Sequence, residues 1–283
     1  MNSERIDQAG LLQHQYKTAD NLMARVQLHD RFSTNPYSWF LWVFDQFELP
    51  NECQILELGC GPCLLWQKNL NRLPDGWQLT LTDFSPGMLE EGARNLGAYS
   101  RNVRFEQVDA QQIPFEDGSF EAVVANHMLY HVPDKSRALG EIQRVLKPGG
   151  RFYAATNGAR HMRGLSELAA QAFPDYARKI QTTFQRLSFT LENGADLLSP
   201  YFEQVSLHVY EDGLHVTESE PLIDYVLSML STQAAELNPT HVAAIRQHVQ
   251  QILAQQGAIH IEKSGGLFIA QKLPPANNSK PDG

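Results

Sequence analysis

The sequence is poor in cysteine, in long apolar runs and in positive charge. Three cysteines among 283 residues cannot supply the dense disulfide framework of a small secreted protein. No apolar run approaches the roughly 18 residues that cross a membrane, and the N-terminus lacks the charged-then-apolar layout of a secretory signal. These absences predict a protein of the cytoplasm that does not bind membranes.

The formal net charge of −9 disfavours a nucleic-acid partner, because binding to phosphates requires a basic surface. The cysteines also lack a second ligand pair at the spacing of a zinc site, so no metal is expected. Hydrophobic residues make up 42% of the chain, which is ordinary for a globular protein. The length suffices for one large domain with added segments.

Between residues 50 and 160, short apolar runs alternate with amphipathic stretches. Strands are predicted at residues 53–58, 77–82, 103–108, 120–126 and 151–156, and helices at 63–70, 86–96 and 135–146. Strands that alternate with helices favour parallel pairing through right-handed crossovers, with helices on both faces of the sheet. The core therefore predicts an α/β fold built on a doubly wound, mostly parallel sheet.

The flanking segments differ from this core. Residues 1–49 are aromatic-rich and predicted to be helical. Beyond residue 160, helices are predicted at 161–181, 191–198, 220–237 and 239–256, and strands at 202–210, 259–262 and 266–272. The last two of these strands are expected to close the sheet, with a final antiparallel strand at its edge, and the sheet itself is expected to have seven strands. We assign residues 161–272 to the same domain and residues 273–283 to a disordered polar tail.

The stretch LGCGPCL, residues 58–64, permits two interpretations. CGPC is the pattern of a thioredoxin-like dithiol, which also lies between a strand and a helix. The acidic residue and glycines of Glu57-Leu58-Gly59-Cys60-Gly61 instead indicate a loop whose backbone approaches a ligand closely. A dinucleotide fingerprint would need glycine at Leu64, and no Gly-Lys-Ser/Thr phosphate loop occurs.

Polar residues follow the next three predicted strands. Asp83 ends the second strand, 22 residues after Gly61, where a carboxylate can accept hydrogen bonds from both hydroxyls of a ribose. Asp109-Ala110 follows the third strand and Asn126-His127 the fourth. Ligands of open parallel sheets bind beyond the carboxyl ends of the strands, so these residues predict one binding site.

Four motifs in order carry a family resemblance: ILELGCGPCLL, LTLTDFSPGMLEEGARN, VDAQQIPFEDGSFEAVVANHMLYHVPD and ALGEIQRVLKPGGRFYAAT. Over residues 50–160 the chain resembles class I S-adenosylmethionine-dependent methyltransferases, specifically the type 11 small-molecule group. The resemblance implies a Rossmann-like core at residues 50–160 that binds S-adenosylmethionine and releases S-adenosylhomocysteine. It implies an N-terminal helical lid at residues 1–49 and a C-terminal helical insertion that forms the acceptor pocket, with Tyr225, Met229 and the helix near Phe173 as candidate lining residues. The family usually has a third glycine where this chain has Cys63.

The same resemblance assigns roles to individual residues. Glu57 and the loop Gly59-Cys60-Gly61 would lie beside the amino-acid portion of the cofactor. Asp83 would bind the ribose, Phe84 and Met88 would lie near the adenine, and Asp109, Ala110 and Gln111 would contact its edge. Asn126 and His127 would flank the sulfonium. Tyr16 or Arg31 of the lid would reach the cofactor's carboxylate, whereas Trp39, Phe40 and Trp42 are interpreted as an apolar face docked on the sheet.

The catalytic chemistry is less constrained by the sequence. His127 and His131 lie four residues apart and would share a face if the stretch were helical. Either is a candidate general base for a phenol, hydroxyl or acid acceptor, although positioning of the acceptor alone also suffices for this reaction. Methylation of a small organic acceptor on oxygen or nitrogen is the favoured function. Three alternatives stay open: a non-catalytic cofactor-binding module, a redox protein using Cys60 and Cys63, and a methyltransferase of RNA or protein, for which the composition gives no support. The apolar positions of the helices at 220–256 are compatible with a homodimer.

Overall fold

A seven-stranded sheet forms the centre of the computed structural model, which describes residues 20–172, 188–230 and 239–273. The strand order is β3-β2-β1-β4-β5-β9-β6. The strands are β1 (Cys53–Leu58), β2 (Trp77–Asp83), β3 (Val103–Gln107), β4 (Phe120–Asn126), β5 (Leu146–Asn157), β6 (Glu203–Tyr210) and β9 (Gly265–Gln271). The predicted α/β class and the mostly parallel sheet are confirmed, since β1 to β5 pair with one another only in parallel among the described residues.

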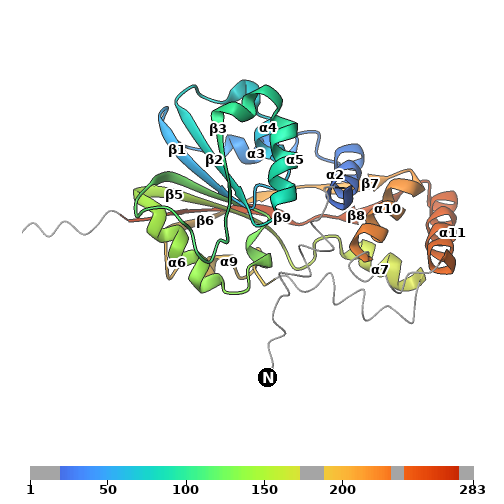
Figure 1. Ribbon diagram of the computed structural model, residues 1–283. Coiled ribbons are helices and arrows are strands. Elements are labelled where there is room, and N and C mark those ends of the chain that lie inside the picture. The colour runs from blue at the N-terminus through green and yellow to red at the C-terminus, as the bar shows by residue number, and fades with distance from the viewer. Residues whose placement is uncertain (1–19, 173–187, 231–238, 274–283) are drawn as a thin grey trace, which may run out of the picture.

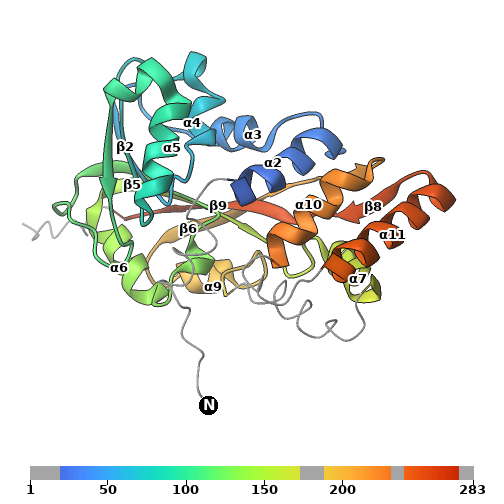
Figure 2. The ribbon, with the colours of Figure 1, turned by 45° about the vertical axis from the view of Figure 1, so that its right-hand side comes forward.

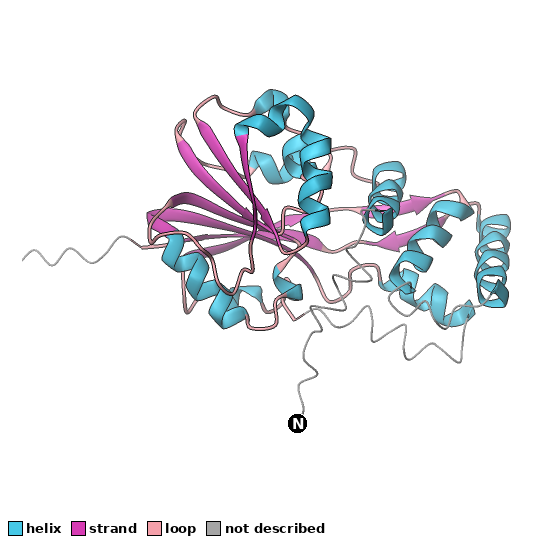
Figure 3. Cartoon of the chain, viewed as in Figure 1, coloured by secondary structure: helices cyan, strands magenta, loops and turns pink. Residues whose placement is uncertain are grey.

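Helices cover both faces of this sheet (Figure 3). The described helices, including those of a second unit beside the sheet, are α2 (Asp20–Phe32), α3 (Trp39–Asp45), α4 (Leu64–Gln67), α5 (Pro86–Leu96), α6 (Lys135–Val145), α7 (Arg163–Ala172), α9 (Gly194–Leu198), α10 (Ser219–Leu230) and α11 (Pro239–Gln256). Successive strand residues point to opposite faces: Leu56 packs in the core that contains α6 and α9, whereas Ile55 packs in the core that contains α3 and α4. Both faces are therefore apolar, as a parallel sheet requires.

The predicted place of the last strand is wrong. β9 lies inside the sheet, antiparallel to both β5 and β6, and β6 is the edge strand. The burial of the strands explains this order, because Gly265–Phe268 is buried on both faces whereas β6 is largely exposed, with Leu207 and Val209 facing solvent. A strand buried on both faces needs a neighbour on each side, and an exposed one does not.

The strand predicted at residues 259–262 is not part of the central sheet. It is β8 (Ile259–Glu262), which pairs with β7 (Gly213–Val216) in a separate two-stranded sheet. No strand was predicted at β7, since four residues carry little pattern. The helix predicted from Cys63 to Leu70 is also shorter than expected, because α4 ends at Gln67 and a 3-10 turn follows at Leu70–Arg72.

α2, α7, α10, α11 and the β7–β8 ribbon form a second unit with its own apolar core. Leu28, Leu165, Ile223, Ile245 and Ile261 are all buried in it. Figures 1 and 2 show this unit beside the sheet, next to the ends of β5, β6 and β9. The predicted Tyr16 contact, the helix near Phe173, the side chain of Met229 and residues 274–283 of the predicted tail lie outside the described residues. Among the described helices, none is long and apolar enough to cross a membrane.

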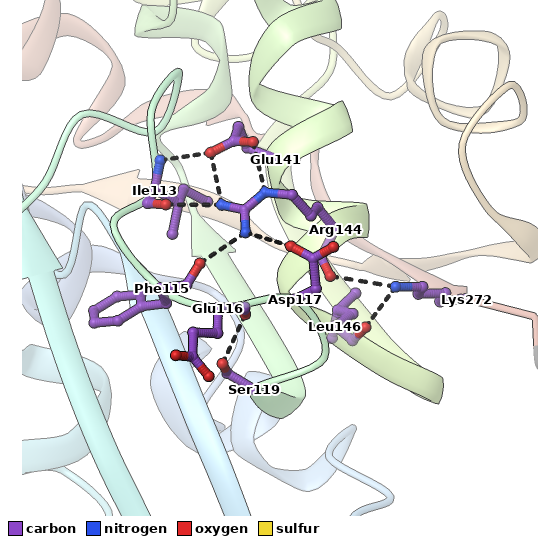
Figure 4. A network of polar contacts seen from close by, with 9 residues as sticks. All are labelled: Ile113, Phe115, Glu116, Asp117, Ser119, Glu141, Arg144, Leu146 and Lys272. Carbon is purple, nitrogen blue, oxygen red and sulfur yellow. Dashed lines mark hydrogen bonds and ion pairs between the residues drawn. The ribbon is translucent and has the colours of Figure 1, made fainter.

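Arg144, at the end of α6, ties the loop before β4 to the helix (Figure 4). Its guanidinium donates to the carbonyl oxygens of Ile113 (2.8 Å) and Phe115 (2.7 Å) and to both carboxylate oxygens of Glu141 (2.8 and 2.9 Å). Glu141 in turn accepts from the Ile113 N–H at 2.8 Å. One side chain therefore satisfies two loop carbonyls that have no strand partner.

We expect Arg144→Met to lower the free energy of unfolding by about 2 kcal/mol, because it leaves these carbonyls and the Glu141 carboxylate short of donors. The loss is limited because the Arg144 side chain is 30% exposed and water screens part of its charge. Urea unfolding measures the change. Arg163→Met, which removes an exposed Arg163–Glu167 pair on α7, is the matched control. Equal loss in both variants would contradict the role of the network.

Candidate functional site

The loop after β1 turns back on itself through left-handed backbone positions. Gly59, Gly61 and Cys63 have φ values of 66°, 53° and 58°. A Cβ on Gly59 would lie 2.7 Å from the Cβ of Met128, in the segment after β4. Glycine is therefore required at position 59 by both conformation and close approach. The loop passes directly beside the chain that carries Asn126 and His127.

Asp83, at the end of β2, is held against this loop. Its Oδ2 accepts from the Gly61 N–H at 2.9 Å, and its Oδ1 accepts from the Ser85 N–H at 2.8 Å. Burial raises the pKa of Asp83, although these backbone N–H groups partly offset the effect. A carboxylate offers about four acceptor positions, so Asp83 keeps capacity for two further donors beside the glycine loop.

Glu57 lies beneath the same loop and is 1% exposed. Its Oε2 accepts from the indole Nε1–H of Trp66 at 2.5 Å. Burial raises the pKa of Glu57 to about 8, and the nearby charge of Asp83 also raises it, against the indole hydrogen bond. A carboxyl with this pKa is largely protonated at neutral pH, and a cationic group brought next to it would favour its ionised form.

Cys60 and Cys63 are buried, free thiols. Burial raises the pKa of Cys60 well above its ordinary value, and the adjacent Cys63 raises it further. A redox dithiol needs a low-pKa, accessible thiolate. The environment of Cys60 is the opposite of the one that the redox interpretation requires.

Cys63 stands where the resemblance leads one to expect glycine, and α5 makes room for it. A Cβ on Gly92 would lie 2.5 Å from the Cys63 Sγ and 3.2 Å from the Gly61 carbonyl oxygen. The absent side chain of Gly92 thus accommodates the thiol. This pairing keeps the left-handed loop closed without a third glycine.

We expect Gly92→Ala to lower the free energy of unfolding by about 1–3 kcal/mol, because the added methyl group overpacks the site. The double variant Cys63→Gly/Gly92→Ala should recover most of that loss, since it removes the thiol from the contact. Urea unfolding of the single and double variants measures this coupling. An additive double variant would show that Gly92 and Cys63 do not compensate each other.

Asp109 and Gln111 form a turn after β3. Both carboxylate oxygens of Asp109 lie 3.1 Å from the Gln111 Nε2, and Oδ1 accepts from the Gln111 N–H at 2.9 Å. The Gln111 Oε1 accepts from the Asp134 N–H at the start of α6. Ala110 between them is buried. The turn is therefore a fixed polar edge, with the Asp109 carboxylate already engaged.

The other predicted adenine contacts lie on the neighbouring segment. Phe84 is half-buried between β2 and α5, and its carbonyl accepts from the Gln107 Nε2 at 2.9 Å. Met88 is 2% exposed in the first turns of α5. Phe84 thus presents part of its ring, whereas Met88 contributes to the wall of the core.

Asn126 and His127 meet the N-terminal segment at Trp39. The Trp39 Nε1–H donates to Asn126 Oδ1 at 3.3 Å, and the Trp39 ring lies 5.0 Å from the His127 ring. His127 has a φ of 59° and a buried Nδ1 without a hydrogen-bond partner among the described residues. Burial, together with the charges of Lys263 and His131, lowers the pKa of His127 to about 4.

The condition under which His127 and His131 would share a helical face is not met, because His127 is left-handed and only Leu129–His131 forms a 3-10 turn. The His131 ring packs edge-to-face on Tyr130 at 4.5 Å. Burial and the charges of Arg25 and Lys135 lower the pKa of His131 to about 4. Its packing against Tyr130 favours the role of fixing the loop.

The structure describes four of the lid residues that the sequence singled out: Arg31, Trp39, Phe40 and Trp42. Arg31 forms an exposed ion pair with Glu218 and lies over the ring of Phe32, so its guanidinium is committed to the second unit. Trp39, Phe40 and Trp42 pack against the apolar core of the sheet, as the sequence predicted. Trp39 in addition contacts Asn126 and His127. Sequence reasoning also missed His161 and Lys263, described below, for which no local motif gives a signal.

Residues 56–154 match the family model described as "Methyltransferase domain". The ubiquinone/menaquinone biosynthesis C-methyltransferase UbiE of Hahella chejuensis is 32% identical over 143 residues, which are 49% of this chain and 57% of that protein. The chain therefore spans little more than half the length of this curated relative. The domain match confirms the family resemblance drawn from the four motifs.

Two solved structures have the same fold. Phosphoethanolamine N-methyltransferase 2 of Haemonchus contortus, in complex with phosphomonomethylethanolamine and S-adenosylhomocysteine, aligns with a TM-score of 0.58 at 17% identity, covering 94% of this chain and 59% of that one. The [4+2]-cyclase SpnF aligns with a TM-score of 0.56 at 18% identity, covering 92% and 95%. Because one of these proteins is named for a cyclisation, the fold alone does not determine the reaction.

Proposed function

We propose that this chain, which belongs to the class I S-adenosylmethionine-dependent methyltransferases, transfers a methyl group to a small organic acceptor. The observation that carries the proposal is the Asp83 carboxylate, held by the Gly61 N–H beside a glycine loop at the end of β2. A carboxylate in this position binds ribose hydroxyls. The loop beside it has no arrangement for a pyrophosphate, which favours a mononucleoside cofactor.

The residues of the loop fit S-adenosylmethionine by their chemistry. Asp83 has acceptor positions for two hydroxyls, and Gly59 and Gly61 let the backbone approach the amino-acid portion. Glu57, protonated while buried, would become the counter-charge for its ammonium group. When bound, the cofactor supplies a methyl group already activated by a positively charged sulfur.

The remaining residues would orient the cofactor and exclude water. Phe84 and Met88 would pack near the adenine, and the backbone of Ala110 and Gln111 would border its edge. Asp109 would receive the adenine amino group only if the Gln111 amide moved from it. Asn126 and Trp39 would close the site over the reacting methyl group. Cys60 would contribute only to the packing of the loop, and Tyr16 would contact the cofactor from the lid.

The second unit is proposed to bind the acceptor, because it lies next to the carboxyl ends of β5 and β6 and the start of β9 (Figure 2). The apolar positions of α10 and α11 that were compatible with a homodimer are used inside this unit, where Ile223 and Ile245 are buried. They are therefore no argument for a dimer. The homodimer is still a prediction, and sedimentation equilibrium tests it by measuring the molar mass in solution.

Calorimetric titration with S-adenosylhomocysteine, with NAD as the control ligand, tests the cofactor. Micromolar binding of the first and none of the second are expected. An acceptor screen with S-adenosylmethionine labelled in its methyl group then tests transfer. Binding without transfer to any acceptor would favour the non-catalytic module, and absence of S-adenosylhomocysteine binding would refute the proposal.

A further inference from the structure

Five titratable residues from distant parts of the chain come together where the sheet meets the second unit. We refer to them as the histidine cluster. They lie on α2, after β4, after β5, between β6 and β7, and between β8 and β9: His29, His127, His161, Asp212 and Lys263. The rings of His29 and His161 lie 6.4 Å apart. Of these five residues, only His127 is among those proposed to lie at the cofactor. The other four extend the cluster toward the second unit, which is proposed to bind the acceptor.

Two imidazole nitrogens in this cluster have no hydrogen-bond partner within the part of the chain that the structure describes. The Nδ1 atoms of His29 and His127 are fully enclosed and without a hydrogen bond among the described residues. The His29 ring packs edge-to-face against Tyr225 at 5.8 Å, a contact that gives its Nδ1 no hydrogen bond. Buried polar atoms are rarely left unpaired, because each one costs its desolvation. Two such atoms in one cluster indicate a polar ligand.

The cluster holds one cation and no available carboxylate. Lys263 forms an ion pair with Asp212, and these side chains are 12% and 1% exposed. Asp212 also accepts from the Ser33 hydroxyl (2.7 Å) and from the backbone N–H groups of Asn35 (3.1 Å) and Gly213 (2.7 Å). Its acceptor capacity is therefore used. Lys263 keeps N–H donors beyond the one that it gives to Asp212.

The three histidines are neutral at physiological pH. Burial is the largest cause of the lowered pKa of each, and the charge of Lys263 lowers all three further. Asp212 acts in the opposite direction on His29 and His161. Burial lowers the pKa of Lys263, and the ion pair with Asp212 and the charge of Asp30 on α2 partly offset this effect. A neutral imidazole offers one donor and one acceptor, which matches a hydroxyl group that donates and accepts.

We propose that the histidine cluster is the acceptor subsite, and that it takes a compound with an acidic hydroxyl group, such as a phenol or an enol, in preference to an amine. The inference rests on the proposed function, because it places the acceptor next to the cofactor edge at His127. An ammonium group would meet the charge of Lys263 and find Asp212 already saturated. A hydroxyl group pairs with the unpaired nitrogens, and an acidic one that has lost its proton to solvent carries a negative charge that Lys263 stabilises.

The test compares two probes of similar size, 4-nitrophenol and benzylamine, on the full chain saturated with S-adenosylhomocysteine at pH 7. His29→Phe keeps a ring against Tyr225 and removes both nitrogens. We expect 4-nitrophenol to bind the unchanged protein and to bind His29→Phe about tenfold more weakly, the loss of one hydrogen bond. Benzylamine should bind neither. His215→Phe, on the exposed face of β7, is the control and should bind the phenol normally.

Two further readouts separate the possible failures. The thermal midpoint of His29→Phe should equal or exceed that of the unchanged protein, since a buried unpaired nitrogen is removed. The ring C–H resonances of His29 and His127 should shift when 4-nitrophenol is added to the unchanged protein, a readout that needs no variant to fold. Benzylamine binding as tightly as the phenol, or no shift of these resonances, would overturn the subsite. Failure of S-adenosylhomocysteine to bind would instead overturn the proposed function.

Discussion

Asp83→Ala is expected to weaken the binding of S-adenosylhomocysteine by about 100-fold. The carboxylate would accept two charge-assisted hydrogen bonds from the ribose, each worth about 1.5 kcal/mol, and about 3 kcal/mol corresponds to a factor of about 10² in affinity. The same substitution leaves the Gly61 N–H without its acceptor, so the glycine loop loses the contact that holds it in place. Both effects lower the affinity for S-adenosylhomocysteine.

Calorimetry on folded protein measures this change. Glu90→Ala removes a carboxylate from the exposed side of the adjacent α5, and it should leave the affinity unchanged. Circular dichroism of both variants checks that the fold is intact. Unchanged affinity in Asp83→Ala would contradict the proposed ribose contact, because no other carboxylate ends β2.

Glu57→Gln is expected to stabilise the ligand-free protein and to weaken its binding of S-adenosylhomocysteine. The ordinary pKa of a glutamate is 4.5, and burial raises that of Glu57 to about 8 in the folded protein. Between these values the folded state holds a proton that the unfolded state has lost. The free energy of unfolding therefore falls as the pH rises from about 4.5 to 8. Below pH 4.5 Glu57 is protonated in both states, and the stability is not reduced.

Glutamine keeps an oxygen for the Trp66 indole and cannot ionise. The variant should therefore match the original protein near pH 4.5 and exceed its free energy of unfolding by about 3–5 kcal/mol at pH 8. Urea unfolding at both pH values measures the difference, with Glu90→Gln as the control. An identical pH dependence of the variant and the original protein would contradict the raised pKa.

The same carboxyl connects stability to binding. If the cofactor's ammonium group lies at Glu57, binding lowers the pKa of Glu57 and releases up to one proton near neutral pH. Titrations in two buffers with different ionisation enthalpies measure that proton. Glu57→Gln should bind without releasing it. A buried acid that destabilises the empty protein is then explained by the charge that it offers to the ligand.

Much of the proposed cofactor site was predictable from the sequence, because its signals are local. An apolar run followed by Glu57-Leu58-Gly59-Cys60-Gly61 encodes a strand and a tight loop. Asp83 and Asn126 could be placed at strand ends from their own neighbours, and parallel strands bring their carboxyl ends to one edge of a sheet. The match to four ordered motifs then named the family.

Other features required the tertiary structure, because they join residues far apart in the sequence. The sequence alone determined the parallel core, the glycine loop and the carboxylate that faces it, since strand periodicity and turn chemistry act over a few residues. Only the folded chain decided that β9 enters between β5 and β6, that Gly92 makes room for Cys63, and that His29, His161 and Lys263 meet. Burial and electrostatic pairing depend on distances between atoms in the folded chain. A local sequence pattern does not indicate which distant segments come into contact.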